Sequence, residues 1–436
     1  MSRILFTTMP MAGHLRPGLP MARQLADAGH EVAWYSGAKY AALSERAGAR
    51  VFPMGADLDF DDAEMDTRAN RSGRKPGLQT LKWAILEVFI GPIPGWVAEL
   101  DAVIDEFRPD VVVAEQGFMA GPIAAERRGI PSVVFSVSPL GLSSVDTAPF
   151  GTGLLPSSSP LGRLRNRSLN WMLRSVVFAE CQRAAEQVRI RLGLPPLPGY
   201  FMDWGAQIAD RYLCPSVPEF EYPRRDLPAT VEFVGPMLPA GIDAFDPPAW
   251  WDDVLAARAA GRPVVLVTQG TLATDPHNLV LPAVEGLAGS DALVVATAIG
   301  YDADAVLPAD DRPANLRLTP FIPFDRLLPL VDVMVTNGGY GGVQMALAHG
   351  VPLVVAGLTE DKAEVSARVT WAGAGVALRT DTPSPEQVRD GVTAVLDGPR
   401  YRERARELEA AYARHDGAAR AAEVVLEVAA SRRTVG

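Results

Sequence analysis

Cysteine, long apolar runs and excess positive charge are all scarce in this sequence. Cys181 and Cys214 are its only cysteines, too few for a disulfide framework or a thiolate metal site. No run approaches 18 apolar residues and the start, "MSRILFTTMP", has no long apolar segment, so we expect a cytoplasmic protein with no membrane span. The formal net charge of −11 argues against a nucleic-acid partner.

The rest of the composition is that of a folded globular protein. Hydrophobic residues make up 48% of the chain and charged residues 21%, which excludes a largely disordered protein. A length of 436 residues exceeds what one hydrophobic core usually serves, so we expect two domains. We expect a monomer or a homodimer.

Short apolar, β-branched runs alternate with helical patterns along the chain. In the first half they lie at 3–8, 31–36, 110–115 and 132–137, and in the second at 263–270, 292–298, 316–322, 333–338 and 352–357. Continuous apolar strands of this kind indicate parallel sheets covered on both faces. The sequence therefore predicts an α/β protein with two Rossmann-like, doubly wound domains that face each other.

The stretch 231–251 is rich in Pro and Gly and has no periodicity, which is typical of a linker. We place an N-terminal domain at 1–234, a linker at 235–250 and a C-terminal domain at 251–436. We also consider an arrangement in which the last helix of the C-terminal domain packs back on the N-terminal domain.

Two polar residues follow strands of the first predicted sheet. His14 comes after the first strand, ahead of a helix opened by Pro17, and Glu115 ends the strand at 110–115. Carboxyl ends of parallel strands share one edge of a sheet, so the Glu115 carboxylate can orient the His14 imidazole as a general base. Asp110 lies at the opposite end of its strand and is better interpreted as a turn residue. A single His in a loop more often has no catalytic role. The predicted proximity of Glu115 is what favours a catalytic role for His14.

The segment 336–345, "TNGGYGGVQM", places four glycines between a buried strand and a helix. A plain strand-to-helix turn needs one glycine, whereas a phosphate held by backbone N–H groups at a helix N-terminus needs close approach or positive φ. We expect such a cradle at Gly338 to Val343, with a positive φ at Gly339.

Three segments together resemble the nucleotide-sugar-dependent glycosyltransferases of natural-product metabolism, which have the GT-B fold. They are "GHLRPGLPMARQLADAGHEVAWYS" at 13–36, the Gly-rich turn at 337–342 and "HGVPLVVAGLTEDKAEVSARVTWAGAGVAL" at 349–378. The resemblance covers almost the whole chain. It implies that His14 is the catalytic base and Glu115 its orienting acid, where the family more often has Asp.

The resemblance also implies a donor site, with departures from the family pattern. Asn337 stands at the family's His position and Met345 at its Glu position, with Gln344 beside it as a possible ribose ligand. Asp361 and Lys362 stand where the family has an Asp-Gln pair that reads the sugar. By this resemblance, the donor site consists of Thr271 below the phosphates, Phe321 and Ile322 at the nucleobase, and Asn337, Gly338, Gly339, Tyr340, Gly341, Gly342, Gln344, Asp361 and Lys362.

Two further features concern the acceptor and metals. Segments 57–101 and 138–170 interrupt the first predicted domain, and their aromatic residues, with Trp204, either line an apolar acceptor pocket or belong to the core. Asp302 and Asp304 imitate a metal-binding Asp-x-Asp motif, but we interpret them as a polar loop. The resembled family works without metal, so we expect no metal and no cofactor besides the nucleotide-sugar co-substrate.

The function that this resemblance implies is inverting transfer of a hexose to a hydroxyl of an apolar small molecule, such as a polyketide, a macrolide or a phenolic. We expect a UDP-sugar rather than a dTDP-sugar donor. Two alternatives stay open: a sugar-nucleotide 2-epimerase, and a non-catalytic accessory partner of a glycosyltransferase.

Overall fold

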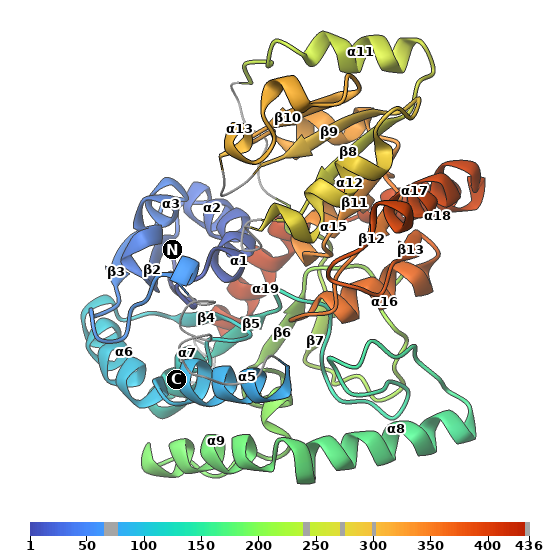
Figure 1. Cartoon of the computed structure of the whole chain (residues 1–436). Helices are drawn as coiled ribbons and strands as arrows, with labels where there is room; N and C mark the ends of the chain where they lie inside the picture. Colours follow the sequence, from blue (N-terminus) through green and yellow to red (C-terminus); the bar gives the residue numbers. More distant parts are fainter. Residues whose placement is uncertain (65–76, 239–244, 271–274, 299–301, 432–436) are drawn as a thin grey trace.

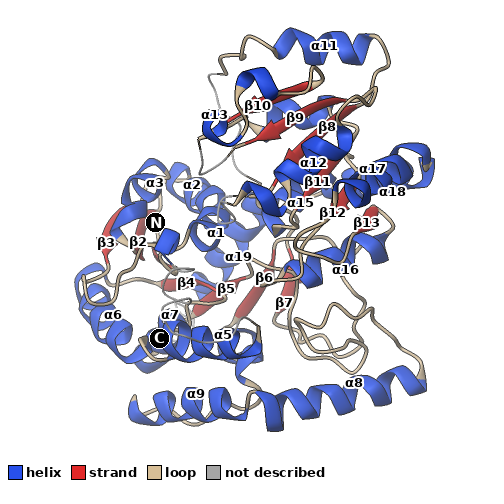
Figure 2. Cartoon of the chain, viewed as in Figure 1, coloured by secondary structure: helices blue, strands red, loops and turns tan. Residues whose placement is uncertain are grey.

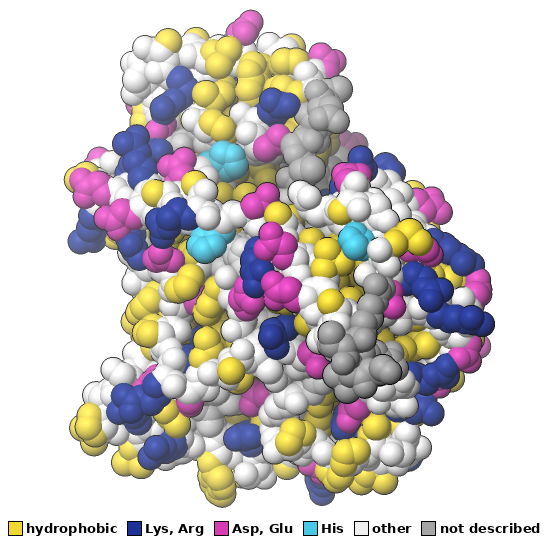
Figure 3. Space-filling model, turned by 180° about the vertical axis from the view of Figure 1, so that it is seen from behind, with side chains coloured by type: hydrophobic (Ala, Val, Ile, Leu, Met, Phe, Trp, Pro, Cys, Tyr) yellow, Lys and Arg dark blue, Asp and Glu magenta, His cyan; other side chains and the backbone are white. Residues whose placement is uncertain are grey.

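The computed structural model describes residues 1–64, 77–238, 245–270, 275–298 and 302–431. Two parallel β-sheets dominate it (Figure 1), and helices surround them (Figure 2). This confirms the prediction of two doubly wound α/β units. On the face drawn in Figure 3, Lys and Arg side chains are interspersed with Asp and Glu.

The first sheet has seven strands in the order β3-β2-β1-β4-β5-β6-β7. Their bounds are β1 Arg3–Thr7, β2 Glu31–Ser36, β3 Arg50–Pro53, β4 Val111–Glu115, β5 Ser132–Phe135, β6 Arg211–Cys214 and β7 Val231–Phe233. The sequence predicted β1, β2, β4 and β5 and missed the other three. In particular, the Pro- and Gly-rich stretch that we interpreted as linker begins with an edge strand, because Tyr212 to Cys214 pair with Val231 to Phe233.

The helices of the N-terminal half lie around this sheet and cover both of its faces, apart from α8, which extends away from the sheet (Figure 1). They are α1 Ala12–Leu15, α2 Leu19–Asp27, α3 Ala41–Arg46, α5 Leu78–Trp83, α6 Ile93–Phe107, α7 Ala120–Arg128, α8 Pro160–Met172, α9 Ala179–Arg191 and α10 Trp204–Ile208. Leu5 of β1 is buried in one core cluster, together with Trp96 of α6. Its neighbours Ile4 and Phe6 are buried in a second cluster on the opposite face. This alternation explains why the strand has no polar face.

The second sheet has six strands in the order β10-β9-β8-β11-β12-β13. Their bounds are β8 Val264–Thr268, β9 Leu293–Thr297, β10 Leu316–Thr319, β11 Val333–Thr336, β12 Leu353–Val355 and β13 Gly375–Ala377. The helices of this half are α11 Trp251–Ala259, α12 Val280–Leu287, α13 Ala303–Val306, α14 Phe324–Leu327, α15 Tyr340–Ala348, α16 Lys362–Ala372, α17 Pro385–Asp397 and α18 Pro399–Tyr412. The three-residue edge strand β13 was not predicted.

The last helix, α19 (Gly417–Ser431), lies against the first sheet although it ends the chain (Figure 1). Its buried residues Ala421, Val424 and Val425 share a core cluster with Ile4 and Phe6 of β1. Burial of these apolar side chains fastens α19 to the N-terminal half, because apolar surface removed from water stabilises the contact.

One helical stretch, Leu78–Phe107, is long and apolar enough to cross a membrane by length and composition alone. It consists of α5, a π-helical segment Ala84–Ile90 and α6. The core helix of a soluble protein passes the same test, and Trp96, Val97 and Leu100 of α6 are fully buried in the first core cluster.

Candidate active site

His14 and Glu115 meet at the carboxyl edge of the first sheet. β1 and β4 are parallel neighbours with Thr7 opposite Ala114, so the residues that follow both strands lie at the same edge. The Nδ1 atom of His14 lies 3.0 Å from Oε2 of Glu115, the pairing that the sequence predicted. Asp110 lies at the other edge, where its carboxylate accepts a hydrogen bond of 2.7 Å from the Arg3 backbone N–H.

Backbone N–H groups fix the orientation of the Glu115 carboxylate, which is fully buried. Oε2 accepts a 2.7 Å hydrogen bond from Gly117 N, and Oε1 accepts a 3.4 Å one from Met9 N. A buried carboxylate held in this way stays beside Nδ1 of His14. When the ring proton is on Nδ1, beside the Glu115 carboxylate, the lone pair of Nε2 is free to accept a proton. The side chain of His14 retains 20% exposure, and its ring centroid lies 6.2 Å from that of Phe89.

Acidic side chains shift the titration of His14. Burial has the largest effect and lowers the pKa of the imidazole, whereas the charge of Glu115 and its hydrogen bond to the ring raise it. Asp361 and Glu360 of the second half raise it further, so the pKa of His14 lies above its usual value. The structure thus brings His14 within electrostatic reach of Asp361.

The loop that carries Asp361 has an unusual backbone. Glu360 has φ of 56°, which is costly for a non-glycine residue and is often found at functional sites. Asp381 anchors the loop by accepting a 2.7 Å hydrogen bond from Leu358 N. Lys362 Nζ lies 2.8 Å from Glu360 Oε2. Burial, followed by the charge of Glu360, raises the pKa of Asp361 to about 6, against the opposing effect of Lys362.

The Gly-rich turn joins β11 to α15, and one of its expected details was wrong. The positive φ belongs to Gly338, at 87°, whereas Gly339 is the N-cap of α15 with φ of −58°. The N–H of Gly338 is directed to Thr336 Oγ1 at 3.3 Å, so the turn closes before Gly339. Within 4 Å, a Cβ on Gly341 would meet no atom outside its chain neighbours and its own helix backbone. The first N–H groups of a helix have no intrahelical partner, and α15 presents them at this open turn.

Asn337 stiffens this turn from its start. Its Nδ2 group donates to the backbone oxygen of Gln269, after β8, and its Oδ1 atom accepts from Gly339 N at 3.4 Å. One side chain therefore ties the ends of two neighbouring strands, β8 and β11, to the N-cap of α15. The side chain of Tyr340 is buried in the core, so only its backbone faces the turn.

Sequence similarity assigns these features to a family. Residues 284–430 match the family described as "Erythromycin biosynthesis protein CIII-like, C-terminal domain", and residues 19–198 match the "Glycosyl transferase 4-like domain". The 4'-demethylrebeccamycin synthase of Lentzea aerocolonigenes is 43% identical over 97% of this chain and 99% of its own length. UDP-glycosyltransferase 2 of Phaeomoniella chlamydospora is 33% identical over 98% and 96%.

The chain belongs to the natural-product glycosyltransferases. Its fold agrees, because the crystal structure of the glycotransferase of kitacinnamycin superimposes with a TM-score of 0.73 at 23% identity, covering 98% of both chains. The protein is therefore a glycosyltransferase with the GT-B architecture that acts on a natural-product acceptor. This result weighs against both alternatives that the sequence left open.

The expected ribose ligand of this glycosyltransferase is wrongly assigned. Gln344 is buried, its Nε2 group donates to Pro215 O at 2.6 Å, and its Oε1 atom accepts from the hydroxyl of Tyr412. The side chain fastens α15 to α18 and to the segment after β6. Its partners lie far away in sequence, so the motif alone gave no sign of them.

Of the two residues predicted to contact the nucleobase, one lies at the surface and the other in the core. Phe321 is 61% exposed, as a stacking platform for a base requires, and its backbone oxygen accepts from Thr319 Oγ1 at 3.0 Å. The side chain of Ile322 is buried, which leaves only its backbone for contact with a ligand. Thr271 lies outside the described residues.

The aromatic candidates for the acceptor pocket divide in the same way. Trp96 and Trp204 belong to the core, whereas Trp83 and Phe89 are partly buried at its margin. Phe89 is the one beside His14. Asp302 is the N-cap of α13 and accepts from Asp304 N. Within the described residues, no group of three or more His, Cys, Asp and Glu side chains could hold a metal ion.

Proposed function

We propose that this glycosyltransferase transfers a hexose from a UDP-sugar to a hydroxyl of an apolar small-molecule acceptor, with inversion at the anomeric carbon. The observation that carries the proposal is the His14–Glu115 pair, with its 3.0 Å contact at the carboxyl edge of the first sheet. A neutral imidazole oriented by a buried carboxylate is the usual arrangement for taking a proton from a hydroxyl.

The proposed reaction is a single displacement. Nε2 of His14 accepts the acceptor's hydroxyl proton while the oxygen forms a bond to the anomeric carbon. The bond from this carbon to the diphosphate oxygen breaks on the opposite face, and the nucleoside diphosphate leaves with the electron pair. Glu115 stabilises the imidazolium that forms, and the N-terminus of α15 stabilises the charge of the leaving group.

The donor contacts follow from the second half of the chain. The N–H groups of Tyr340, Gly341 and Gly342, in the first turn of α15, face the diphosphate. Phe321 stacks on the base, and Asp361 and Lys362 contact the sugar hydroxyls. We favour UDP over dTDP because a relative of 33% identity is named a UDP-glycosyltransferase. The acceptor lies on the side of the first sheet, near Phe89.

The test is incubation with UDP-α-glucose and a phenolic acceptor, followed by mass spectrometry and proton NMR of the product. We expect a β-glucoside and release of UDP. An α-glucoside would contradict the single displacement. An epimerised UDP-sugar formed without acceptor would indicate the epimerase alternative, and the absence of any product across a panel of acceptors and donors would favour the accessory role.

A further inference from the structure

The segment between β5 and α8, residues 136–159, connects the catalytic edge of the first sheet to the second half of the molecule. Its start is fixed beside Glu115, because the next residue, Gln116, holds two of its serines. Ser136 Oγ donates to Gln116 Oε1 at 2.9 Å, and Gln116 Nε2 donates to Ser138 Oγ at 2.6 Å. This segment therefore begins at the proposed acceptor side of the site.

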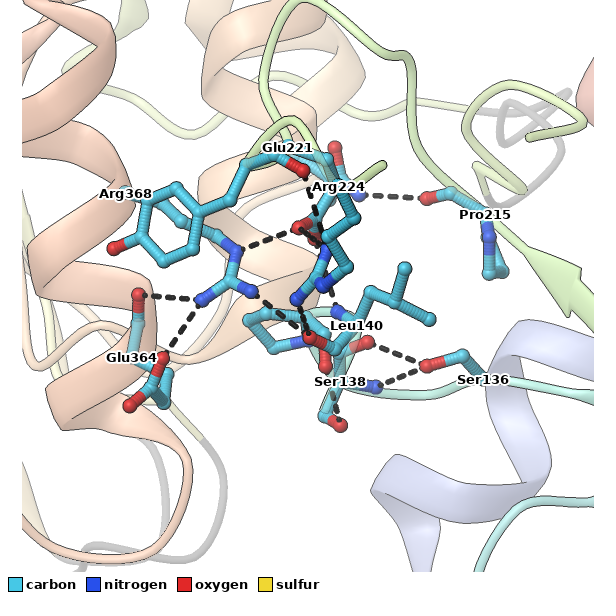
Figure 4. Close-up of polar contacts among 11 residues, drawn as sticks. Ser136, Ser138, Leu140, Pro215, Glu221, Arg224, Glu364 and Arg368 are labelled. Atoms are coloured by element: carbon cyan, nitrogen blue, oxygen red, sulfur yellow. Dashed lines mark hydrogen bonds and ion pairs between the residues drawn. The ribbon is translucent and has the colours of Figure 1, made fainter. Parts of the chain in front are cut away.

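The middle of the segment meets a buried charged cluster (Figure 4). Leu140 N donates to Glu221 Oε1 at 3.0 Å, and Leu140 O accepts from Arg368 Nη2 at 3.0 Å. Arg224 Nη2 donates to the same Leu140 oxygen at 2.7 Å. Arg368 belongs to α16, and its guanidinium also pairs with Glu221 at 2.9 Å. One backbone position of the first half is thus held by charged groups from both halves.

The end of the segment is fastened to α16 through Glu364. A single oxygen, Oε1, accepts hydrogen bonds from Gly151 N at 3.0 Å and from Gly153 N at 2.9 Å. The other oxygen accepts from Arg368 Nη1 at 3.0 Å. Glu364 is 4% exposed, so its carboxylate has no face left for a ligand, and its role is to hold the segment.

Close backbone approach accompanies these hydrogen bonds. A Cβ on Gly153 would lie 3.2 Å from the backbone oxygen of Ala363, and Gly153 has φ of 60°. Gly151 has φ of 89°. The two glycines allow their N–H groups to converge on one carboxylate oxygen, and they bring the segment against the first turn of α16.

We propose that Glu364 is a positioning residue that sets the distance between the acceptor and the donor sugar. Its helix begins with the two residues assigned to the sugar, because Asp361 is the N-cap of α16 and Lys362 its first residue. The carboxylate that holds residues 151–153 is thus one helical turn from the sugar subsite. The inference rests on the proposed function and adds that the same helix positions both substrates.

The consequence concerns the competition between acceptor and water for the sugar. When the segment leaves α16, the acceptor hydroxyl loses its fixed distance to the anomeric carbon, and water takes its place as nucleophile. Hydrolysis then breaks the same bond to the diphosphate and releases free hexose and UDP. Binding of UDP itself does not involve residues 151–153.

The experiment compares Glu364→Gln with Glu126→Gln. Glu126 is a matched control because it makes a bidentate pair, at 2.8 and 2.9 Å, with a buried arginine, Arg189, within the first half. For Glu364→Gln we expect an acceptor KM raised about tenfold or more and a larger share of hydrolysis, with the UDP Kd unchanged. Glu126→Gln is expected to leave all three quantities at their wild-type values.

A second variant keeps the test independent of the stability of the charged cluster. Gly153→Asn tolerates the positive φ, adds a Cβ against Ala363 and leaves the Glu364–Arg368 pair intact, so it should show the same rise in acceptor KM and hydrolysis. Wild-type values of both quantities in a folded Glu364→Gln or Gly153→Asn protein would overturn the proposal. If wild-type protein forms no glycoside at all, the proposed function fails instead.

Discussion

Replacement of Glu115 by Gln is the perturbation for which the structure gives the most detailed expectation. The amide preserves the volume and one acceptor oxygen, but it removes the negative charge 3.0 Å from His14 Nδ1. The imidazolium that forms during proton transfer loses this partner. A hydrogen bond to a charged group contributes roughly 1.5–3 kcal/mol, so we expect a loss of about 10- to 150-fold in kcat/KM on the alkaline plateau.

The pH profile gives a second, independent signature. Burial lowers the pKa of His14, and Glu115 together with Asp361 and Glu360 raises it above the usual value. Removal of the Glu115 charge therefore lowers this pKa. His14 acts only when neutral, and activity therefore rises with pH through this pKa. In Glu115→Gln the acid limb of kcat/KM shifts to lower pH while the plateau falls, and the variant loses less activity in acid than in base.

The assay is initial-rate glucosyl transfer from pH 5 to 9, with Asp110→Asn as control. Asp110 is a carboxylate at the other end of the same strand, bonded to Arg3 N at 2.7 Å. Replacing Asp110 removes a carboxylate from the same strand but leaves the charge beside His14 in place. It therefore measures any general damage to the strand. An acid limb that stays at its wild-type pH in a folded Glu115→Gln protein would refute the pairing.

Three further predictions concern the donor site. Lys362→Gln is expected to change the preference among UDP- and dTDP-linked hexoses in competition assays, because an amide can accept hydrogen bonds and an ammonium cannot; an unchanged preference places Lys362 outside the sugar site. Asn337→Ala should weaken UDP binding in calorimetry by at most about 10- to 150-fold, since backbone N–H groups carry most of it, and a larger loss in a folded protein argues against the backbone cradle. Gly339→Ala should stay folded, because φ is −58° and the nearest atom to its Cβ is 3.9 Å away. The variant should bind UDP about tenfold more weakly. Wild-type affinity would show that the diphosphate does not bind at the N-terminus of α15.

The sequence allowed prediction of the strands that lie within longer apolar runs, including the three-residue strand β12 in the run 352–357. It missed the edge strands β7 and β13. β7 and β13 have three residues each, at the edges of their sheets. Three residues are too few to show periodicity, and without a distinct apolar run around it such a strand is defined only by its pairing partners. The stretch 231–251, which has a linker-like composition, therefore begins with a strand, because "VEF" is followed directly by Gly- and Pro-rich sequence.

At the site, the residues that follow strands were easier to place than those that make tertiary contacts. His14 and Glu115 were predictable because parallel strands bring their ends together. Gln344 and Glu364 were not, because their partners, Tyr412 and the backbone of Gly151 and Gly153, lie far along the chain. The positive φ was assigned to Gly339 instead of Gly338, because the sequence of two adjacent glycines does not show which of them adopts the left-handed conformation.

The most direct test of the central claim, that His14 takes the acceptor proton, is His14→Ala with transfer and UDP binding measured on the same preparation. Loss of a general base costs on the order of 10²–10⁴ in rate, and UDP contacts the second half of the molecule in this account. We therefore expect kcat to fall by that factor while the calorimetric Kd for UDP stays at the wild-type value. Transfer at the wild-type rate by a folded His14→Ala protein would contradict the account.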